Sequence, residues 1–274
     1  MRFAVCNELF EGWSLEDTFR TVHDLGYDGI ELAPFTLAPT ITALSAEQRA
    51  AIRELAARYL LPISGLHWLL ARVPGVHLTS PDPAIRDVTR AYLLELVRAC
   101  ADLGGKFLVF GSPKQRDVLP GVEREAAWEW SRATFQTVGQ VAADSGVTFC
   151  LEPLAPTETN LFSTAAEAAR MVDEVGTPGF RLMLDVKAMS SESLPIPQII
   201  AAQRNRFVYF HANDRNLREP GSGDVDFTPI FRALEQAGYD DWMSIEVFEY
   251  KPDPVAIARR GVGYLRSLRP PAGS

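Results

Sequence analysis

Cysteine is scarce in this sequence of 274 residues. Cys6, Cys100 and Cys150 are odd in number and lie mostly within apolar runs. A disulfide framework needs several paired cysteines, which are typical of small secreted proteins. The pattern therefore excludes a disulfide-stabilised fold and predicts reduced thiols in the core of a cytoplasmic protein.

The sequence also lacks a long hydrophobic run. No stretch has the length needed to span a membrane, and residues 1–5 lead directly into a predicted strand without the apolar segment of a signal peptide. We therefore expect a cytoplasmic protein that has no membrane partner.

Basic residues are fewer than acidic ones. There are 27 Lys and Arg against 35 Asp and Glu, which gives a formal net charge of −8. This balance argues against a nucleic-acid partner and favours a small-molecule substrate. The oligomeric state stays open, and a homo-oligomer is compatible with the sequence.

The sequence does contain a repeated alternation of short apolar runs and helical segments. Eight runs with strand character lie near residues 3–6, 29–32, 62–67, 107–110, 149–152, 182–185, 208–211 and 243–246, and each precedes a segment of helical periodicity. Capping residues mark helix starts, as Ser45 with Gln48 and Asp82 before Pro83 do. We predict a single (β/α)8 TIM barrel over residues 1–269, followed by a loose tail at 270–274.

Four successive strands in the second half each end in a residue that can bind a divalent cation: Glu152, Asp185, His211 and Glu246. Strands of a barrel deliver such side chains to its C-terminal rim, where TIM barrels carry their active sites. Each residue alone would be an ordinary polar strand end, but the four together predict one site. Three carboxylates and one imidazole suit a single divalent ion, Mn²⁺ first, with Mg²⁺, Co²⁺ or Zn²⁺ as alternatives.

These motifs resemble the xylose-isomerase-like TIM-barrel superfamily. The resemblance covers nearly the whole chain and rests on Leu25-Gly26-Tyr27-Asp28-Gly29-Ile30-Glu31, Glu152-Pro153-Leu154, Leu184-Asp185, His211 and Glu246. The nearest group is the ketose 3-epimerases, typified by D-tagatose 3-epimerase, with the related hydroxypyruvate and inosose enzymes. In those epimerases the four matching positions bind one metal and the two glutamates move a proton. The resemblance therefore implies that Glu152 and Glu246 are catalytic.

The resemblance also implies substrate contacts. Glu158 matches a family glutamate that binds the terminal hydroxyl of the substrate, and either Arg215 or Arg218 matches a family arginine. His67 ends strand three, where it either binds substrate or is a hydrogen-bonded or packing residue of the rim.

One contact common in the family is absent, because Ala188 occupies the position of a substrate-binding histidine. Lys187 lies two residues beyond Asp185 and would point the same way in an extended segment, so it either replaces that histidine or is exposed. Residues 111–116 could hold an anion, although we favour a solvated loop. Glu31 is predicted to hydrogen-bond a site residue.

Three aromatic residues, Trp13, Phe35 and Trp68, follow the first three strands and would either wall a sugar pocket or pack ordinarily.

We therefore predict a divalent-metal-dependent isomerase or epimerase of a small keto-sugar or polyol derivative, acting through an enediolate. The alternative on the same site is a metal-dependent lyase or dehydratase of the inosose or 3-dehydroshikimate type. An AP-endonuclease-like repair enzyme would need a trinuclear zinc site, for which four histidines are too few. A non-catalytic sugar-binding barrel is the remaining alternative.

Overall fold

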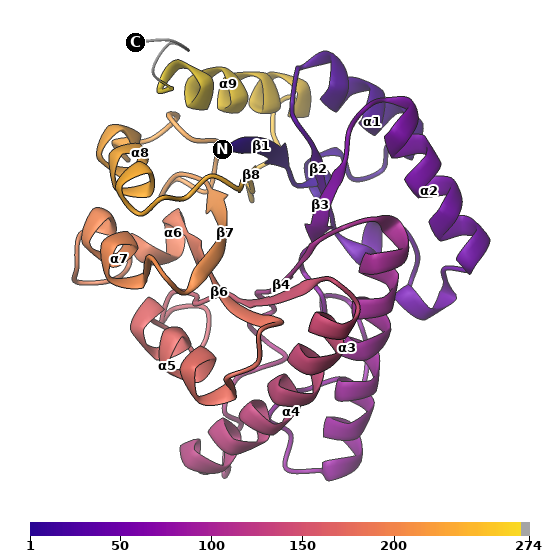
Figure 1. Ribbon diagram of the computed structural model, residues 1–274, viewed down its shortest axis with the longest axis vertical. Helices are drawn as coiled ribbons and strands as arrows, with labels where there is room; N and C mark the ends of the chain where they lie inside the picture. Colours follow the sequence, from indigo (N-terminus) through magenta and orange to yellow (C-terminus); the bar gives the residue numbers. More distant parts are fainter. Residues whose placement is uncertain (270–274) are drawn as a thin grey trace.

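The computed structural model describes residues 1–269 of the chain, and the tail predicted at 270–274 lies outside the described residues. Eight strands form one parallel sheet in the order β1-β8-β7-β6-β5-β4-β3-β2. A parallel bridge from Cys6 to Glu31 links the ends of β1 and β2, so the sheet is nearly closed. Figure 1 shows the strands at the centre with the helices around them. The predicted (β/α)8 barrel is confirmed.

The strands span β1 (Arg2–Val5), β2 (Ile30–Leu32), β3 (Ile63–Leu66), β4 (Phe107–Phe110), β5 (Thr148–Leu151), β6 (Phe180–Asp185), β7 (Phe207–Ala212) and β8 (Trp242–Ile245). The α-helices are α1 (Leu15–Asp24), α2 (Ala46–Arg58), α3 (Pro83–Leu103), α4 (Arg124–Asp144), α5 (Ala165–Val175), α6 (Val186–Met189), α7 (Ile196–Gln203), α8 (Phe227–Gln236) and α9 (Pro254–Ser267). Short 3-10 helices follow the first two strands: η1 (Asn7–Phe10), η2 (Pro34–Thr36) and η3 (Ile41–Ala43).

Local capping explains where the helices begin. Ser45 and Gln48 form a complete capping box at the start of α2, because each side chain accepts a hydrogen bond from the other residue's backbone N–H. Asp82 directly precedes Pro83, the residue that opens α3, and its side chain accepts a hydrogen bond from the N–H of Ala84. These caps were predicted from the sequence, and the structure confirms them.

The core consists of two hydrophobic clusters separated by the barrel wall. The smaller cluster contains only strand residues, which places it inside the barrel: Ala4, Phe107, Val109, Cys150, Met183, Tyr209 and Trp242. The larger cluster joins the outward-facing strand residues to the helices. The interior cluster fills the barrel below the C-terminal rim, so polar side chains at the rim rest on an apolar floor.

All three cysteines are buried and free, as predicted. Among residues 1–269, each helix is too short or too polar to cross a lipid bilayer.

Candidate functional site

Strand periodicity brings the four predicted ligands into the barrel. Cys150, Met183 and Tyr209 point inward, and the residues two positions further along each chain are Glu152, Asp185 and His211. Alternate residues of a strand share a face, so these side chains also point inward. Sheet register pairs Asp185 with His211, while Ala212 pairs with Ile245, the residue before Glu246.

The four side chains form one compact donor cluster. Glu152, Asp185, His211 and Glu246 each offer a ligand atom, and these atoms all lie within 4.8 Å of one another. The Nδ1 atom of His211 lies 3.2 Å from Glu246 Oε2 and 3.7 Å from Glu152 Oε1. All four residues are buried, so bulk water does not compensate for their charges.

Hydrogen bonds fix the Asp185 carboxylate from two sides. Its Oδ1 accepts from the N–H of Ala188 at 2.6 Å and thereby caps α6, and its Oδ2 accepts from Asn213 Nδ2 at 2.5 Å. The extended segment that we predicted beyond Asp185 is therefore wrong. The chain turns into a short helix because the carboxylate satisfies the first free N–H groups of that helix.

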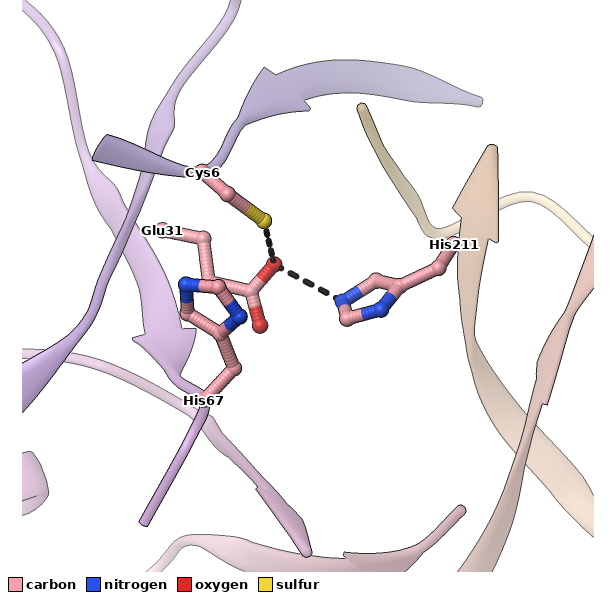
Figure 2. Close-up of side chains that lie close together, drawn as sticks. All are labelled: Cys6, Glu31, His67 and His211. Atoms are coloured by element: carbon pink, nitrogen blue, oxygen red, sulfur yellow. Dashed lines mark hydrogen bonds and ion pairs between the residues drawn. The ribbon is translucent and has the colours of Figure 1, made fainter. Parts of the chain in front are cut away.

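Glu31 orients His211 from below the cluster. Its Oε2 lies 3.0 Å from His211 Nε2 and 3.3 Å from Cys6 Sγ, and Figure 2 shows it between the two residues. With Nε2 engaged in this way, Nδ1 is the nitrogen that faces the carboxylates. The predicted hydrogen-bonding role of Glu31 is confirmed, and such a partner fixes the tautomer of a ligating histidine.

The electrostatics of the cluster fit a bound cation. Burial raises the pKa of Glu152, and burial together with the Glu152 carboxylate raises the pKa of Asp185 to about 7. Burial acts against protonation of His211, but Glu31 and Glu246 outweigh it and raise the pKa of that imidazole well above its ordinary value. Three buried carboxylates exceed the charge that one imidazolium offsets. A divalent cation would supply the missing positive charge, and the set of oxygens with one nitrogen suits it.

Glu246 has additional partners from the first half of the barrel. Trp68 Nε1 donates to Glu246 Oε1 at 2.9 Å, and His67 Nδ1 lies 3.4 Å from the same oxygen. The other nitrogen of His67 lies 2.8 Å from Glu8 Oε2, so this histidine bridges two carboxylates. Burial would raise the pKa of Glu246, but His211 and His67 hold it well below its ordinary value.

Glu152 is positioned by close packing. A Cβ atom added at Gly111 would lie 1.7 Å from Glu152 Oε2, so only glycine leaves room for this carboxylate. Arg116 Nη1 donates to the backbone carbonyl of Glu152 at 2.7 Å, and the Arg116 side chain is fully buried. The solvated loop that we favoured for residues 111–116 is wrong for Arg116, because its guanidinium binds the carbonyls of Phe110 and Glu152 where strands β4 and β5 end. Lys114 in the same loop is exposed.

A cavity of about 30 Å³ opens next to the donor cluster, lined by Trp68, Gly111, Pro113, Glu152, Leu154, Glu158, Lys187, Glu246 and Phe248. Lys187 Nζ donates to Glu158 Oε1 at 2.7 Å and lies 4.2 Å from the centre of the Phe248 ring. Both residues were predicted as substrate contacts, and the structure brings them together at the cavity. Lys187 is largely buried, so the exposed-lysine alternative is wrong.

Neither predicted arginine lines this cavity. The guanidinium of Arg215 is exposed and lies 3.6 Å from Asp224, while that of Arg218 lies 3.6 Å from Glu219. The turn that follows β7 directs both side chains toward acidic neighbours within or beside that turn. His67 is a buried, hydrogen-bonded residue of the rim, which is one of its two predicted roles.

Sequence reasoning missed several supporting residues. Asn213 bridges the site by donating to Asp185 and accepting from the N–H of Lys187 at 2.8 Å. Its position two residues after His211 was an available signal, because alternate residues of an extended chain share a side. Glu8 ends the first predicted run, but no local signal marked its partner, and none marked Gly111, since both roles depend on residues more than 40 positions away.

Two further groups of donors could also hold an ion: Cys6, Glu31, His67 and His211; and Glu8, His67 and Glu246. Figure 2 shows the first of these groups. We favour the cluster of Glu152, Asp185, His211 and Glu246, because two of its carboxylates line the 30 Å³ cavity. The first alternative group has no residue in that lining, and the second has only Glu246.

Comparison with known proteins gives consistent matches. A family model described as "Xylose isomerase-like TIM barrel" matches residues 19–268. D-psicose 3-epimerase of Ruminiclostridium cellulolyticum is 29% identical over 63% of this chain, and the matched region spans 59% of that relative. The 3-dehydro-D-guloside 4-epimerase of Escherichia coli (strain K12) is 24% identical over 97% of this chain and 100% of its own length. A crystal structure of D-psicose 3-epimerase in the presence of D-fructose has a TM-score of 0.87 at 21% identity, covering 98% of this chain and 99% of that one.

Proposed function

The chain belongs to the xylose isomerase-like TIM barrel family, and from this we propose that it is a divalent-metal-dependent epimerase of a keto-sugar. One observation carries the proposal: four buried donor groups within 4.8 Å of one another adjoin a cavity that both glutamates line. The names of the relatives, which are epimerases of ketoses and of a keto-glycoside, support this reaction class.

Glu152, Asp185, His211 and Glu246 are the residues that would hold the ion. Bound there, a divalent cation would supply a Lewis acid that stabilises the negative charge developing beside the substrate carbonyl. Mn²⁺ is our first choice, since three carboxylates and one imidazole form a hard donor set.

Glu246 and Glu152 divide the proton transfer between them. The Trp68 N–H and the neighbouring His67 favour the ionised form of Glu246, which makes it the base that removes the proton beside the carbonyl. Glu152 lines the same cavity, and it would return a proton to the other face of that carbon. The product then differs from the substrate in the configuration of one carbon.

Lys187 and Glu158 position the substrate at the mouth of the cavity. Their ion pair, 2.7 Å long, presents a donor and an acceptor side by side to sugar hydroxyls. Lys187 thus takes the place of the histidine that is common in the family and is replaced by Ala188 here.

Turnover in D₂O tests the proposal. The protein is loaded with Mn²⁺ and incubated with a panel of keto-sugars, and the products are followed by NMR and mass spectrometry. We expect epimers of unchanged carbon skeleton that carry deuterium at the carbon beside the carbonyl, because a proton held on a carboxylate exchanges with water. A product lighter by one water would indicate a dehydratase instead. Epimerisation without deuterium would contradict the two-glutamate mechanism.

A further inference from the structure

A second group of ligand atoms lies on the other side of the His211 ring from the donor cluster. Its members are Cys6, Glu31, His67 and His211, whose ligand atoms all lie within 4.8 Å of one another. His211 turns Nδ1 toward Glu246 and Nε2 toward Glu31, so one imidazole ring faces both groups. The four residues are absent from the lining of the 30 Å³ cavity, so an ion bound by them would lie apart from the substrate.

The spacing of these atoms is close to that of a tetrahedral zinc site. Bonds of about 2.0–2.3 Å place the ligand atoms of Zn²⁺ about 3.3–3.7 Å apart. Glu31 Oε2 lies 3.3 Å from Cys6 Sγ and 3.0 Å from His211 Nε2, and Figure 2 shows the Glu31 carboxylate between those two residues and beside His67. The limit of 4.8 Å on the other separations exceeds the tetrahedral range by about 1 Å, which small side-chain rotations can close.

Two atoms of this group lack hydrogen-bond partners within residues 1–269. Glu31 Oε1 accepts no hydrogen bond there, and His67 Nδ1 lies 3.4 Å from Glu246 Oε1 without forming one. The exposed fractions of Glu31 and His67 are 0% and 1%, so bulk water does not satisfy these atoms. A buried polar atom without a partner is destabilising, and a cation at this position would give both side chains a partner.

The sulfur atom determines which ion this group prefers. One thiolate, one carboxylate and two imidazoles form a borderline-soft donor set, which favours Zn²⁺ or Co²⁺ over Mn²⁺ and Mg²⁺. The donor cluster has three carboxylates and no sulfur, so its preference is for harder ions. Cys6 ligates as the thiolate, and binding therefore releases its proton to water.

An ion can reach this group from the barrel rim. His67 Nε2 lies 2.8 Å from Glu8 Oε2, and Glu8 lines a cavity of about 380 Å³. The exposed residues Glu11 and Lys114 also line this cavity, so it is open to solvent. The Glu8 carboxylate would attract a hydrated cation into the cavity, next to His67.

We propose that Cys6, Glu31, His67 and His211 form a second metal site that binds Zn²⁺, and that an ion there weakens Mn²⁺ binding by the donor cluster. The two ions would lie on opposite sides of one imidazole ring, where their like charges repel in a low-dielectric interior. This coupling is reciprocal, so Mn²⁺ weakens binding at the second site by the same factor. The second site follows from its own four residues and does not depend on the reaction proposed above.

Co²⁺ serves as the probe of the second site, because a thiolate ligand gives Co²⁺ a charge-transfer absorption in the near ultraviolet. The metal-free protein is titrated with Co²⁺, and we expect this absorption to appear and then to disappear when Zn²⁺ is added. Cys6→Ser should abolish it, while His67→Asn should keep it but raise the Co²⁺ concentration needed by at least about tenfold, since one ligand is lost. Cys100→Ser is the matched control, because this buried thiol on α3 lies outside the group and should leave the absorption unchanged.

The same absorption measures the antagonism between the two sites. Mn²⁺ should raise the Co²⁺ concentration for half-maximal absorption by at least about fivefold. This effect should level off once the donor cluster is full, whereas direct competition for the thiolate site would continue to grow with Mn²⁺ concentration.

Three results would contradict the proposal. A wild-type protein without the absorption, or a Cys6→Ser protein that retains it, would show that the second site is wrong. An absorption that is independent of Mn²⁺ would show that the antagonism is wrong. Circular dichroism identifies any unfolded variant, and Cys6→Ala gives a second reading at that position. The spectra require no turnover, so the second site and the epimerase function can fail separately.

Discussion

The two halves of the barrel rim contribute in different ways to the same site. Strands β5 to β8 bring the donor groups, namely Glu152, Asp185, His211 and Glu246. Strand β2 and the segments after β1 and β3 bring residues that hydrogen-bond those donors or each other: Glu8, Glu31, His67 and Trp68. The second half of the barrel thus supplies the donor groups, and the first half fixes the geometry of those groups. Variants in the two halves should therefore fail in different ways.

The largest effect is expected in the half that carries the donors. Glu246→Gln keeps an oxygen that can bind an ion but removes the group that accepts a proton. We expect kcat to fall by about 10²–10⁴-fold with most of the metal retained. Kinetics together with elemental analysis measure both quantities. An active Glu246→Gln enzyme would show that this carboxylate is not the base.

A smaller effect is expected in the half that fixes the geometry. Glu31→Gln removes the negative charge beside His211 Nε2, so the imidazole becomes a weaker ligand. We expect Mn²⁺ affinity to fall about 10- to 100-fold, measured by calorimetry. Glu129→Gln, at an exposed position on α4, serves as the control and should bind normally. Equal affinities for all three proteins would mean that the first half of the rim does not tune the site.

Replacing Lys187 tests whether a proposed substrate contact can be lost while the donor cluster still binds its metal ion. Lys187→Met removes the ammonium group while keeping much of the stem that packs on Phe248. We expect KM to rise by about fivefold, or about 1 kcal/mol, which is the typical net contribution of one hydrogen bond, with unchanged metal content. The exposed Lys106 gives the control variant Lys106→Met. A loss of metal from Lys187→Met would instead place this residue among those that support the cluster.

The smallest effect is a pH dependence of stability in the donor half. Without metal, burial and Glu152 raise the pKa of Asp185 from an ordinary 3.8 to about 7. Because the pKa is higher in the folded state, protonation of Asp185 contributes to the free energy of unfolding. This contribution is fully present below about pH 4 and is lost as the pH rises through 7. A bound cation compensates for the ionised carboxylate, so Mn²⁺ should raise the melting temperature more at pH 8 than at pH 5.5.

Differential scanning calorimetry would measure this as a difference of a few degrees. Asp185→Asn is the control, because an amide does not titrate, and its metal-free melting temperature should change less over the same pH range. An equal Mn²⁺ effect at both pH values would contradict the assignment.

The contrast between the two halves also explains what could be predicted from the sequence. The (β/α)8 pattern and the donor residues are local signals, because a strand that ends in Asp, Glu or His is visible within a few residues. The supporting contacts join distant segments, as Trp68 and Glu246 do across 178 residues. The inward fold of Arg116 was missed for the same reason, since its partner is a backbone carbonyl that no sequence pattern marks.

Asp185 links the donor cluster to the local fold, and this would affect how the protein acquires the proposed divalent ion. Its two oxygens already accept hydrogen bonds from Ala188 and Asn213, so the carboxylate is held in place by the polypeptide itself. Unlike a zinc finger, whose chain remains unfolded until the ion arrives, this barrel can fold first and be loaded later. Chelation should then yield a folded apoprotein that regains activity when the ion is added back. Different divalent ions can be loaded into the same apoprotein and their activities compared directly.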